Sequence, residues 1–175
     1  MNKLMETAKK IKCLICDMDG VLTDGLLYID NNFNELKTFH IHDGVGLKLL
    51  MAAGIEVAVI TGSRNAVVDH RMQQLDIKHY YKDQLNKQDT YTQLKKTLNL
   101  EDEQFAYIGD DLPDRPIMQQ VGLSVAVANA VRQVKEIAVW QTEHAGGRGA
   151  VRELCDLILD SQNKMDLAIA SYLKQ

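Results

Sequence analysis

The 175-residue sequence has a hydrophobic fraction of 46%, a charged fraction of 25% and two prolines, values that exclude a disordered or repetitive protein. Its formal net charge of −4 argues against a nucleic-acid-binding protein, which needs a basic surface. No apolar run approaches the ~20 residues of a membrane span and no signal peptide is recognisable, so we expect a cytoplasmic protein without a membrane partner.

Short apolar runs alternate with amphipathic stretches along the chain, which predicts strands joined by helices in a mostly parallel sheet. The expected strands are residues 11–16, 57–61, 79–81, 105–108 and 123–127. The expected helices are residues 45–53, 66–75, 87–98, 113–121 and 130–137, with Gly54 and Gly122 as helix stops. The fold class is therefore α/β, a three-layer sandwich around a Rossmann-like sheet.

Two segments depart from this alternation. Residues 26–30 and 33–40 are strand-like around the turn residues Asn31-Asn32, which predicts a β-hairpin inserted at about residues 25–40. The tail at about residues 146–175 contains one or two amphipathic helices. We expect one domain over residues 1–175, without a separate cap domain, and we interpret Cys13 and Cys16 as buried thiols because they point to opposite faces of a strand.

Polar clusters follow the predicted strands, and ligands of open α/β sheets bind beyond the carboxyl ends of the strands. The clusters are Asp17-Met18-Asp19-Gly20, Thr61-Gly62-Ser63-Arg64 and Gly109-Asp110-Asp111-Leu112-Pro113-Asp114. Carboxylates gathered at one edge would repel one another unless a divalent cation lay among them, and oxygen ligands suit Mg²⁺. We expect Asp17 and Asp110 to bind this cation.

This set of side chains predicts phosphoryl transfer. An aspartate held against a phosphorus atom can act as the nucleophile, a role that we assign to Asp17. Asp19 lies two residues further on, where it can protonate the leaving oxygen and then activate water. The Thr61 hydroxyl and the ammonium of Lys87 would hold the phosphoryl oxygens, although Lys82 is an alternative to Lys87.

The motifs Asp-x-Asp-Gly-Val-x-Thr-Asp-Gly at 17–25, Thr61-Gly62, Lys87 and Gly-Asp-Asp-x-x-Asp at 109–114 resemble those of the haloacid dehalogenase superfamily. With residues 40–44, 86–87 and 146–153, the chain resembles over nearly its whole length the phosphatases of that superfamily that act on an eight-carbon keto-sugar acid 8-phosphate. The resemblance implies a cytoplasmic step toward lipopolysaccharide. It implies Mg²⁺ bound by Asp17, Asp110 and the main-chain carbonyl of Asp19, and it favours Lys87 over Lys82.

The resemblance also implies a set of substrate contacts. These are Asp19, His40, Ile41, His42, Asp43, Gly44, Lys48, Ser63, Arg71 and Lys87. The family commonly has arginine at the positions of Lys48 and Ser63, so recognition of the substrate carboxylate is expected to shift to Arg64 or to be weaker, because lysine cannot form arginine's two-pronged hydrogen bonds.

Other interpretations of these residues remain. His40 and His42 would share one strand face, but without a third ligand at suitable spacing we expect them to face substrate or solvent. Arg148 could be functional or part of a flexible connection. A nine-carbon keto-sugar acid 9-phosphate phosphatase would share every catalytic residue. A receiver-like signalling module uses similar groups, but it carries adjacent acidic residues after its first strand and a phosphorylated aspartate after its third, unlike this chain.

The chain is too short for a lid of its own. Residues 21–43 and 62–86 are each fewer than the roughly 50 that a cap domain needs, and the exposed edges of a two-stranded hairpin favour pairing. We therefore expect a homo-oligomer. The resemblance implies a tetramer joined through the hairpins, with the segment after Gly146 reaching the site of a neighbour. Truncation after Ala145 should then spare the hydrolysis of small phosphates.

Overall fold

Six parallel strands form the central sheet of the computed structural model, which describes residues 2–174. Across the sheet they are β5 (His79–Tyr81), β4 (Glu56–Ile60), β1 (Cys13–Cys16), β6 (Phe105–Gly109), β7 (Leu123–Ala126) and β8 (Trp140–Gln141). The chain runs outward from β1 through β4 to β5, then returns to β6 on the other side of β1. The strand order therefore reverses beside β1, which is where such sheets bind ligands.

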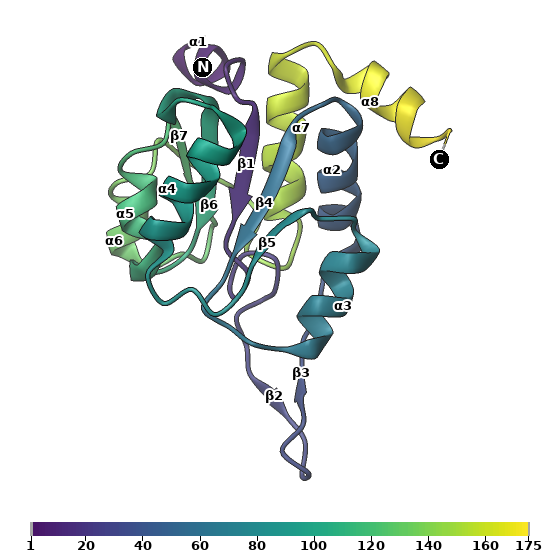
Figure 1. The fold of residues 1–175 in the computed structure, drawn as a ribbon, viewed down its shortest axis with the longest axis vertical. Helices are drawn as coiled ribbons and strands as arrows, with labels where there is room; N and C mark the ends of the chain where they lie inside the picture. Colours follow the sequence, from purple (N-terminus) through teal and green to yellow (C-terminus); the bar gives the residue numbers. More distant parts are fainter. Residues whose placement is uncertain (1, 175) are drawn as a thin grey trace.

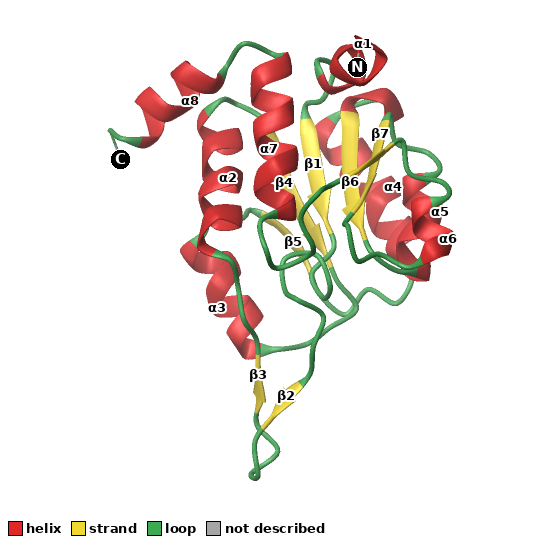
Figure 2. Cartoon of the chain, turned by 180° about the vertical axis from the view of Figure 1, so that it is seen from behind, coloured by secondary structure: helices red, strands yellow, loops and turns green. Residues whose placement is uncertain are grey.

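Helices cover both faces of this sheet (Figures 1 and 2). One layer contains α2 (Ile41–Ala52), α3 (Ala66–Gln74) and α7 (Ala150–Ser161), and the other contains α4 (Lys87–Leu98), α5 (Arg115–Met118) and α6 (Arg132–Lys135). The remaining helical segments are α1 (Asn2–Ala8), α8 (Met165–Tyr172) and the short 3-10 turns η1 (Asp102–Gln104) and η2 (Leu112–Asp114). The predicted three-layer α/β sandwich is confirmed.

The core of the molecule lies along β1, β6 and β7, where every residue is buried. Cys13 and Cys16 are free and buried, as expected of core thiols, and burial raises the pKa of both. Of the helices in residues 2–174, none combines the length and apolar character that crossing a membrane requires.

Several predicted boundaries change in the structure. The expected helix at residues 113–121 is wrong, because the prolines at 113 and 116 lack N–H groups, and η2 and the four-residue α5 take its place. Gly122 ends no helix; a Cβ there would lie 2.6 Å from the carbonyl oxygen of Glu103. Gly54 does follow α2, with φ of +76°. The sequence prediction did not include α1 or the edge strand β8.

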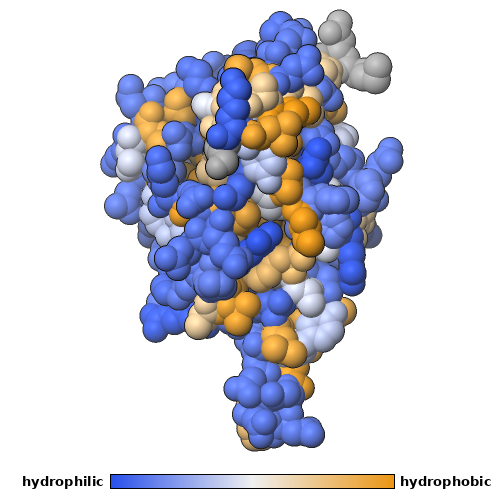
Figure 3. Space-filling model, turned by 90° about the vertical axis from the view of Figure 1, so that its right-hand side faces the viewer, coloured by the Kyte–Doolittle hydropathy of each residue, from blue (hydrophilic) through white to orange (hydrophobic). Residues whose placement is uncertain are grey.

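The predicted hairpin is present but has short strands, β2 (Tyr28–Ile29) and β3 (Glu35–Leu36). It projects from the C-terminal edge of the sheet (Figure 1). The carboxylate of Asp30 accepts hydrogen bonds from the main-chain N–H groups of Asn32 and Asn34, which fixes the turn. Apolar side chains gather along its arms and polar ones cover its tip (Figure 3). The largely exposed apolar residues of the hairpin are Leu26, Leu27, Ile29, Phe33 and Leu36.

The expected strand through residue 40 is wrong, because α2 begins at Ile41 with His40 as its N-cap. His40 and His42 therefore do not share a strand face. Their rings make an edge contact across the start of the helix, with centroids 5.1 Å apart. The apolar periodicity of this helix starts only at Val45, so the predicted helix does not include its first turn, residues 41–44.

The C-terminal tail folds onto its own chain, and its reach to the site of a neighbour stays a prediction. The N–H of Gly147 donates to the carbonyl of Val21 over 2.8 Å. The side chain of Asp43 accepts hydrogen bonds from the N–H groups of Gly149 and Arg152, which caps the start of α7. Helix α7 lies beside α2 (Figure 2) and buries an apolar face made of Val151, Leu154, Cys155, Ile158 and Leu159. Truncation after Ala145 would therefore remove part of the core.

Candidate active site

The polar residues that follow three neighbouring strands meet at one cavity, as the sequence predicted. Asp17 follows β1, Thr61 follows β4 and Asp110 follows β6, while Lys87 is the first residue of α4. The cavity has a volume of about 560 Å³. Its walls are formed by Asp17, Asp19, Gly25, Thr61, Gly62, Ser63, Gln84, Leu85, Lys87, Asp110, Asp111, Pro113 and Asp114.

Lys87 links two carboxylates at the bottom of this cavity. Its Nζ donates to Oδ1 of Asp17 over 2.6 Å and to Oδ1 of Asp114 over 2.7 Å, and all three side chains are nearly buried. The hydroxyl of Tyr107, on β6, donates to the same oxygen of Asp114 over 2.7 Å. The other oxygen of Asp114 accepts from the N–H of Asp110. Asp114 therefore holds both Lys87 and the loop after β6.

Burial and like charge raise the pKa of the two predicted metal ligands. The pKa of Asp17 rises to about 6, mainly through burial and the charge of Asp114, although Lys87 opposes the shift. That of Asp110 rises to about 8 through burial and the charges of Asp17 and Asp114. Burial acts to lower the pKa of Lys87, but its two carboxylate partners outweigh that effect and raise it. The site is thus short of positive charge.

The donor atoms fit a divalent cation. Carboxylate oxygens of Asp17, Asp110 and Asp114 all lie within 4.8 Å of one another. Oδ1 of Asp110 is buried without a hydrogen-bond partner, whereas both oxygens of Asp114 accept hydrogen bonds. Hard oxygen ligands of this kind suit Mg²⁺. The geometry thus fits Asp17 and Asp110 as the predicted metal ligands. Asp114 instead uses its oxygens to hold Lys87, Tyr107 and the N–H of Asp110.

Two glycines let the carboxylates approach the main chain closely. Gly20 has φ of +87°, and a Cβ there would lie 2.1 Å from Oδ2 of Asp110. A Cβ at Gly109 would lie 2.5 Å from Oδ2 of Asp114. Any larger residue at either position would displace a side chain of the site.

Asp19 and Thr61 line the mouth of the cavity. Oδ1 of Asp19 accepts a hydrogen bond from Nζ of Lys37 in the hairpin, over 2.5 Å. The Thr61 hydroxyl oxygen accepts from the N–H of Ser63 over 3.0 Å, so its own proton is free for a phosphoryl oxygen. Lys82 pairs with Asp69 and does not line the cavity, whereas Lys87 does.

Most of the substrate contacts implied for the start of α2 lie elsewhere. Asp43 is buried and caps the start of α7, so its carboxylate does not face the catalytic cavity of its own chain, and its contact with substrate stays a prediction. Gly44 is buried against Arg71, since a Cβ there would lie 2.5 Å from that guanidinium. His40 and His42 line a separate cavity with His144 and Arg148, and the exposed side chain of Ile41 lines neither cavity.

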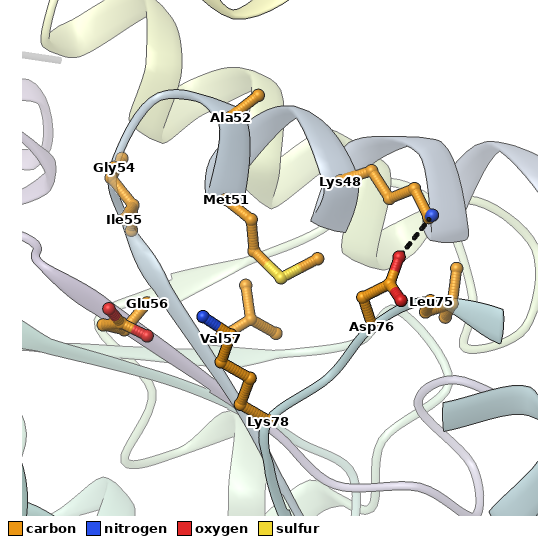
Figure 4. Close-up of a pocket in the computed structure, with 10 residues that line it drawn as sticks. All are labelled: Lys48, Met51, Ala52, Gly54, Ile55, Glu56, Val57, Leu75, Asp76 and Lys78. Atoms are coloured by element: carbon orange, nitrogen blue, oxygen red, sulfur yellow. Dashed lines mark hydrogen bonds and ion pairs between the residues drawn. The ribbon is translucent and has the colours of Figure 1, made fainter. Parts of the chain in front are cut away.

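The implied basic contacts also lie outside the catalytic cavity. Lys48 pairs with Asp76 over 3.0 Å at the rim of a cavity of about 250 Å³ (Figure 4). Figure 4 shows this cavity between α2, the start of β4 and the connection from α3 to β5. Arg64 pairs with Asp83 at the surface. The guanidinium of Arg71 lies 5.7 Å from the centroid of the Phe39 ring. Of the implied contacts, only Asp19, Ser63 and Lys87 line the catalytic cavity.

Sequence reasoning missed several residues of the site. Asp114 carried a signal, its place in Gly-Asp-Asp-x-x-Asp, but no role was assigned to it. Tyr107 reads as an ordinary buried aromatic in a strand, and Lys37 as an exposed residue of a hairpin. Only the tertiary structure brings Asp114, Tyr107 and Lys37 to the site. Arg148 lines the separate cavity with His40 and His42, and its guanidinium contacts Asp24, over 3.4 Å, at the root of the hairpin.

A Rossmann-like sheet with two aspartates after its first strand, a buried lysine and an acidic loop after β6 defines an enzyme of phosphoryl transfer. A family model of haloacid dehalogenase-like hydrolases matches residues 79–154. The chain is 48% identical to 3-deoxy-D-manno-octulosonate 8-phosphate phosphatase of Yersinia pestis, over 94% of this chain and 88% of that protein. The chain therefore belongs to the haloacid dehalogenase-like hydrolase family, as its motifs indicated.

Solved structures give the same assignment. A hydrolase of subfamily III A from Legionella pneumophila is 71% identical, with a TM-score of 0.99 over 100% of this chain and 96% of that one. The 3-deoxy-D-manno-octulosonate 8-phosphate phosphatase of Moraxella catarrhalis, solved with magnesium, phosphate and the sugar acid, is 40% identical. Its TM-score is 0.93, over 98% of this chain and 99% of that one.

Proposed function

We propose that this protein hydrolyses 3-deoxy-D-manno-octulosonate 8-phosphate to the free sugar acid and phosphate, with Asp17 as the nucleophile. The observation that carries the proposal is the contact of Asp17 with the buried Lys87, beside Asp19 and Asp110 in one cavity. The choice of sugar rests on the 48% identity to phosphatases of this substrate. We place the reaction in the cytoplasm, on the route to lipopolysaccharide.

The reaction proceeds in two steps at this cavity. A carboxylate oxygen of Asp17 attacks the phosphorus atom while Asp19 donates a proton to the departing sugar oxygen. Asp19 then takes a proton from the water that attacks the phosphorylated Asp17. Lys87 has three N–H groups: two bind carboxylates, and the third makes only a long contact of 3.5 Å with the Tyr107 hydroxyl, which it can exchange for a phosphoryl oxygen beside the Thr61 hydroxyl.

Mg²⁺, when bound by Asp17, Asp110 and the main-chain carbonyl of Asp19, supplies the positive charge that this acidic site lacks. The carboxylates of Asp17, Asp110 and Asp114 would otherwise repel an incoming phosphate. The raised pKa values of Asp17 and Asp110 fit this requirement, because they report on how poorly the protein alone stabilises both negative charges.

The proposed enzyme is a homo-oligomer, a tetramer joined through its hairpins, in which neighbouring chains complete each site. Lys48 and Arg71, which the family resemblance assigns to substrate, lie outside the cavity of their own chain. They can contact the substrate only if another copy brings them to it. Leu27, Ile29 and Phe33 leave the hairpin with an apolar surface that its own chain does not bury.

The test is phosphate release from a panel of substrates, with and without Mg²⁺. The panel contains the eight-carbon 8-phosphate, a nine-carbon keto-sugar acid 9-phosphate and a simple hexose phosphate. We expect the highest kcat/KM for the eight-carbon substrate and no turnover in excess chelator. A higher kcat/KM for the nine-carbon ester would show that the nine-carbon compound is the preferred substrate. Full activity in chelator would refute the role of Asp110 as a needed metal ligand.

A further inference from the structure

Lys37 is buried to an unusual degree for a lysine of an exposed hairpin. Its side chain is 5% exposed, close to the 6% of Lys87, whereas Lys82 is 49% exposed. Its Nζ donates to Oδ1 of Asp19 over 2.5 Å and lies 2.7 Å from Oε1 of Glu35. The hairpin therefore places one ammonium against the residue to which the proposed function gives both proton transfers.

The two carboxylates keep this ammonium charged. Burial acts to lower the pKa of Lys37, but hydrogen bonds to Asp19 and Glu35 outweigh that effect and raise it. The Lys37 ammonium is shielded from solvent, while its partners Asp19 and Glu35 are 38% and 35% exposed. The ammonium thus joins the hairpin residue Glu35 to Asp19 at the end of β1.

Asp19 needs such an anchor. It stands beyond the end of β1, next to the positive φ of Gly20, and its side chain is 38% exposed. Among residues 2–174, Lys37 is the one group that donates a hydrogen bond to this carboxylate. By contrast, Asp17 and Asp114 are held by Lys87 inside the protein.

We propose that Lys37 is a positioning residue: by binding Oδ1 of Asp19, it leaves Oδ2 directed at the leaving oxygen and later at water. This inference rests on the proposed function, in which Asp19 transfers the protons. General acid–base catalysis requires the carboxylate within hydrogen-bond reach of the reacting oxygen, and a displacement of about 1 Å can cost about 100-fold in rate. The hairpin then serves catalysis in its own chain.

The experiment is a double-mutant cycle of Lys37→Met and Asp19→Asn on the full-length enzyme, with Mg²⁺ and the eight-carbon sugar acid phosphate. Methionine keeps the unbranched stem and removes the charge. We expect Lys37→Met to lower kcat about 10- to 100-fold with KM changed less than threefold. In the Asp19→Asn background, it should lower the remaining rate less than twofold, because the residue on which it acts is absent.

Two further variants control the cycle. Lys82→Met removes an exposed lysine outside the cavity and should leave kcat within twofold of wild type. Lys37→Arg restores the positive charge and should recover most of the lost rate. Circular dichroism and sedimentation of each variant verify that fold and oligomeric state are unchanged; if Lys37→Met misfolds, the comparison is made between Lys37→Arg and Lys37→Gln.

The outcomes separate the inference from the proposed function. Wild-type kcat in Lys37→Met, an equal loss in both backgrounds, or an increase in KM alone would overturn the positioning role. Near-wild-type activity of Asp19→Asn would instead refute the proposed function itself.

Discussion

The carboxylate–lysine cluster and the hairpin lie side by side but are built in opposite ways. In the cluster, Asp17, Lys87 and Asp114 are buried, bonded to one another and carried by the sheet and α4. The hairpin has two strands of two residues each and exposes most of its apolar side chains. Lys37 of the hairpin binds Asp19, which lies beside the cluster in the same cavity.

This difference separates two requirements of the enzyme. Phosphoryl transfer needs charges held at fixed distances, which a buried network on a rigid sheet provides. Recognition of a sugar acid and exclusion of water need a surface above the site, and a two-stranded ribbon cannot provide it alone. We therefore expect substitutions in the cluster to abolish chemistry and substitutions on the apolar surface of the hairpin to change assembly and selectivity, while Lys37 links the hairpin to the chemistry.

The largest effect is expected from Asp17→Asn. An amide is a poor nucleophile and a poor metal ligand, so phosphate release should fall at least about 1,000-fold. The fold should persist, because Asp114 still binds Lys87. Phosphate release and circular dichroism test both statements. Activity above about a tenth of wild type would refute the proposed mechanism.

Lys87→Met should rank next. Loss of one preorganised donor typically lowers kcat by about 100- to 1,000-fold. Asp17 and Asp114 would also lose their shared partner, and removing one member of a buried ion pair costs ~3–5 kcal/mol, so the free energy of unfolding should fall as well. Kinetics and urea denaturation measure the two effects. The matched variant Lys82→Met should change neither quantity. A loss of activity in that variant would indicate that Lys82, not Lys87, is the phosphate-binding lysine.

Ile29→Asp tests the hairpin by placing a charge on its apolar surface. Sedimentation should show a shift toward smaller species, and kcat/KM for the sugar acid phosphate should fall about tenfold. Hydrolysis of a small aryl phosphate should stay within twofold, because the cluster is untouched. Asn32→Asp, at the polar tip, is the control. A monomeric wild-type enzyme with full selectivity would contradict the shared site.

The smallest effect is a pH-dependent stabilisation by Mg²⁺. Without the cation, the folded-state pKa values of Asp17 and Asp110, about 6 and about 8, exceed the ~3.9 of an unfolded aspartate. The folded state then binds more protons, so its stability falls as pH rises from about 4 to 8. Mg²⁺ replaces those protons and should raise Tm by more at pH 8 than at pH 5.5.

Asp110→Asn is the control for this measurement, because it removes the group with the more strongly raised pKa and should reduce the difference between the two pH values. An equal rise in Tm at both pH values for the wild type would show that these carboxylates do not bind the cation.

The sequence predicted those parts of the molecule that depend on local pattern. The apolar runs of β1, β4 and β6 identified the sheet, and the polar residues after them identified the cavity. Helix α4 has the predicted bounds, and the structure shows the side chain of Asn86 capping it by accepting from the N–H of Gln88. The fold class and the family followed from these features.

The parts that failed depend on contacts distant in sequence. Nothing local to Asp43 shows that it caps a helix that begins at Ala150. The helix predicted at residues 113–121 is longer than the observed α5, because the apolar spacing continues past two prolines. The positions of Lys48, Arg64 and Arg71 away from the cavity could not be read from the sequence, since the family resemblance assigns contacts to substrate without stating which copy of the chain provides them.

The contact between Asp43 and the start of α7 also constrains how the protein is made. Helix α2 emerges early from the ribosome, but its buried face, with Leu47 and Leu50, packs beside a helix that is translated about a hundred residues later. Until then the nascent chain exposes apolar surface and is prone to aggregate, which is where chaperones act. Synthesis must therefore pass residue 161 before either helix can be buried, so translation stalled short of that point should leave a nascent chain that depends on chaperones.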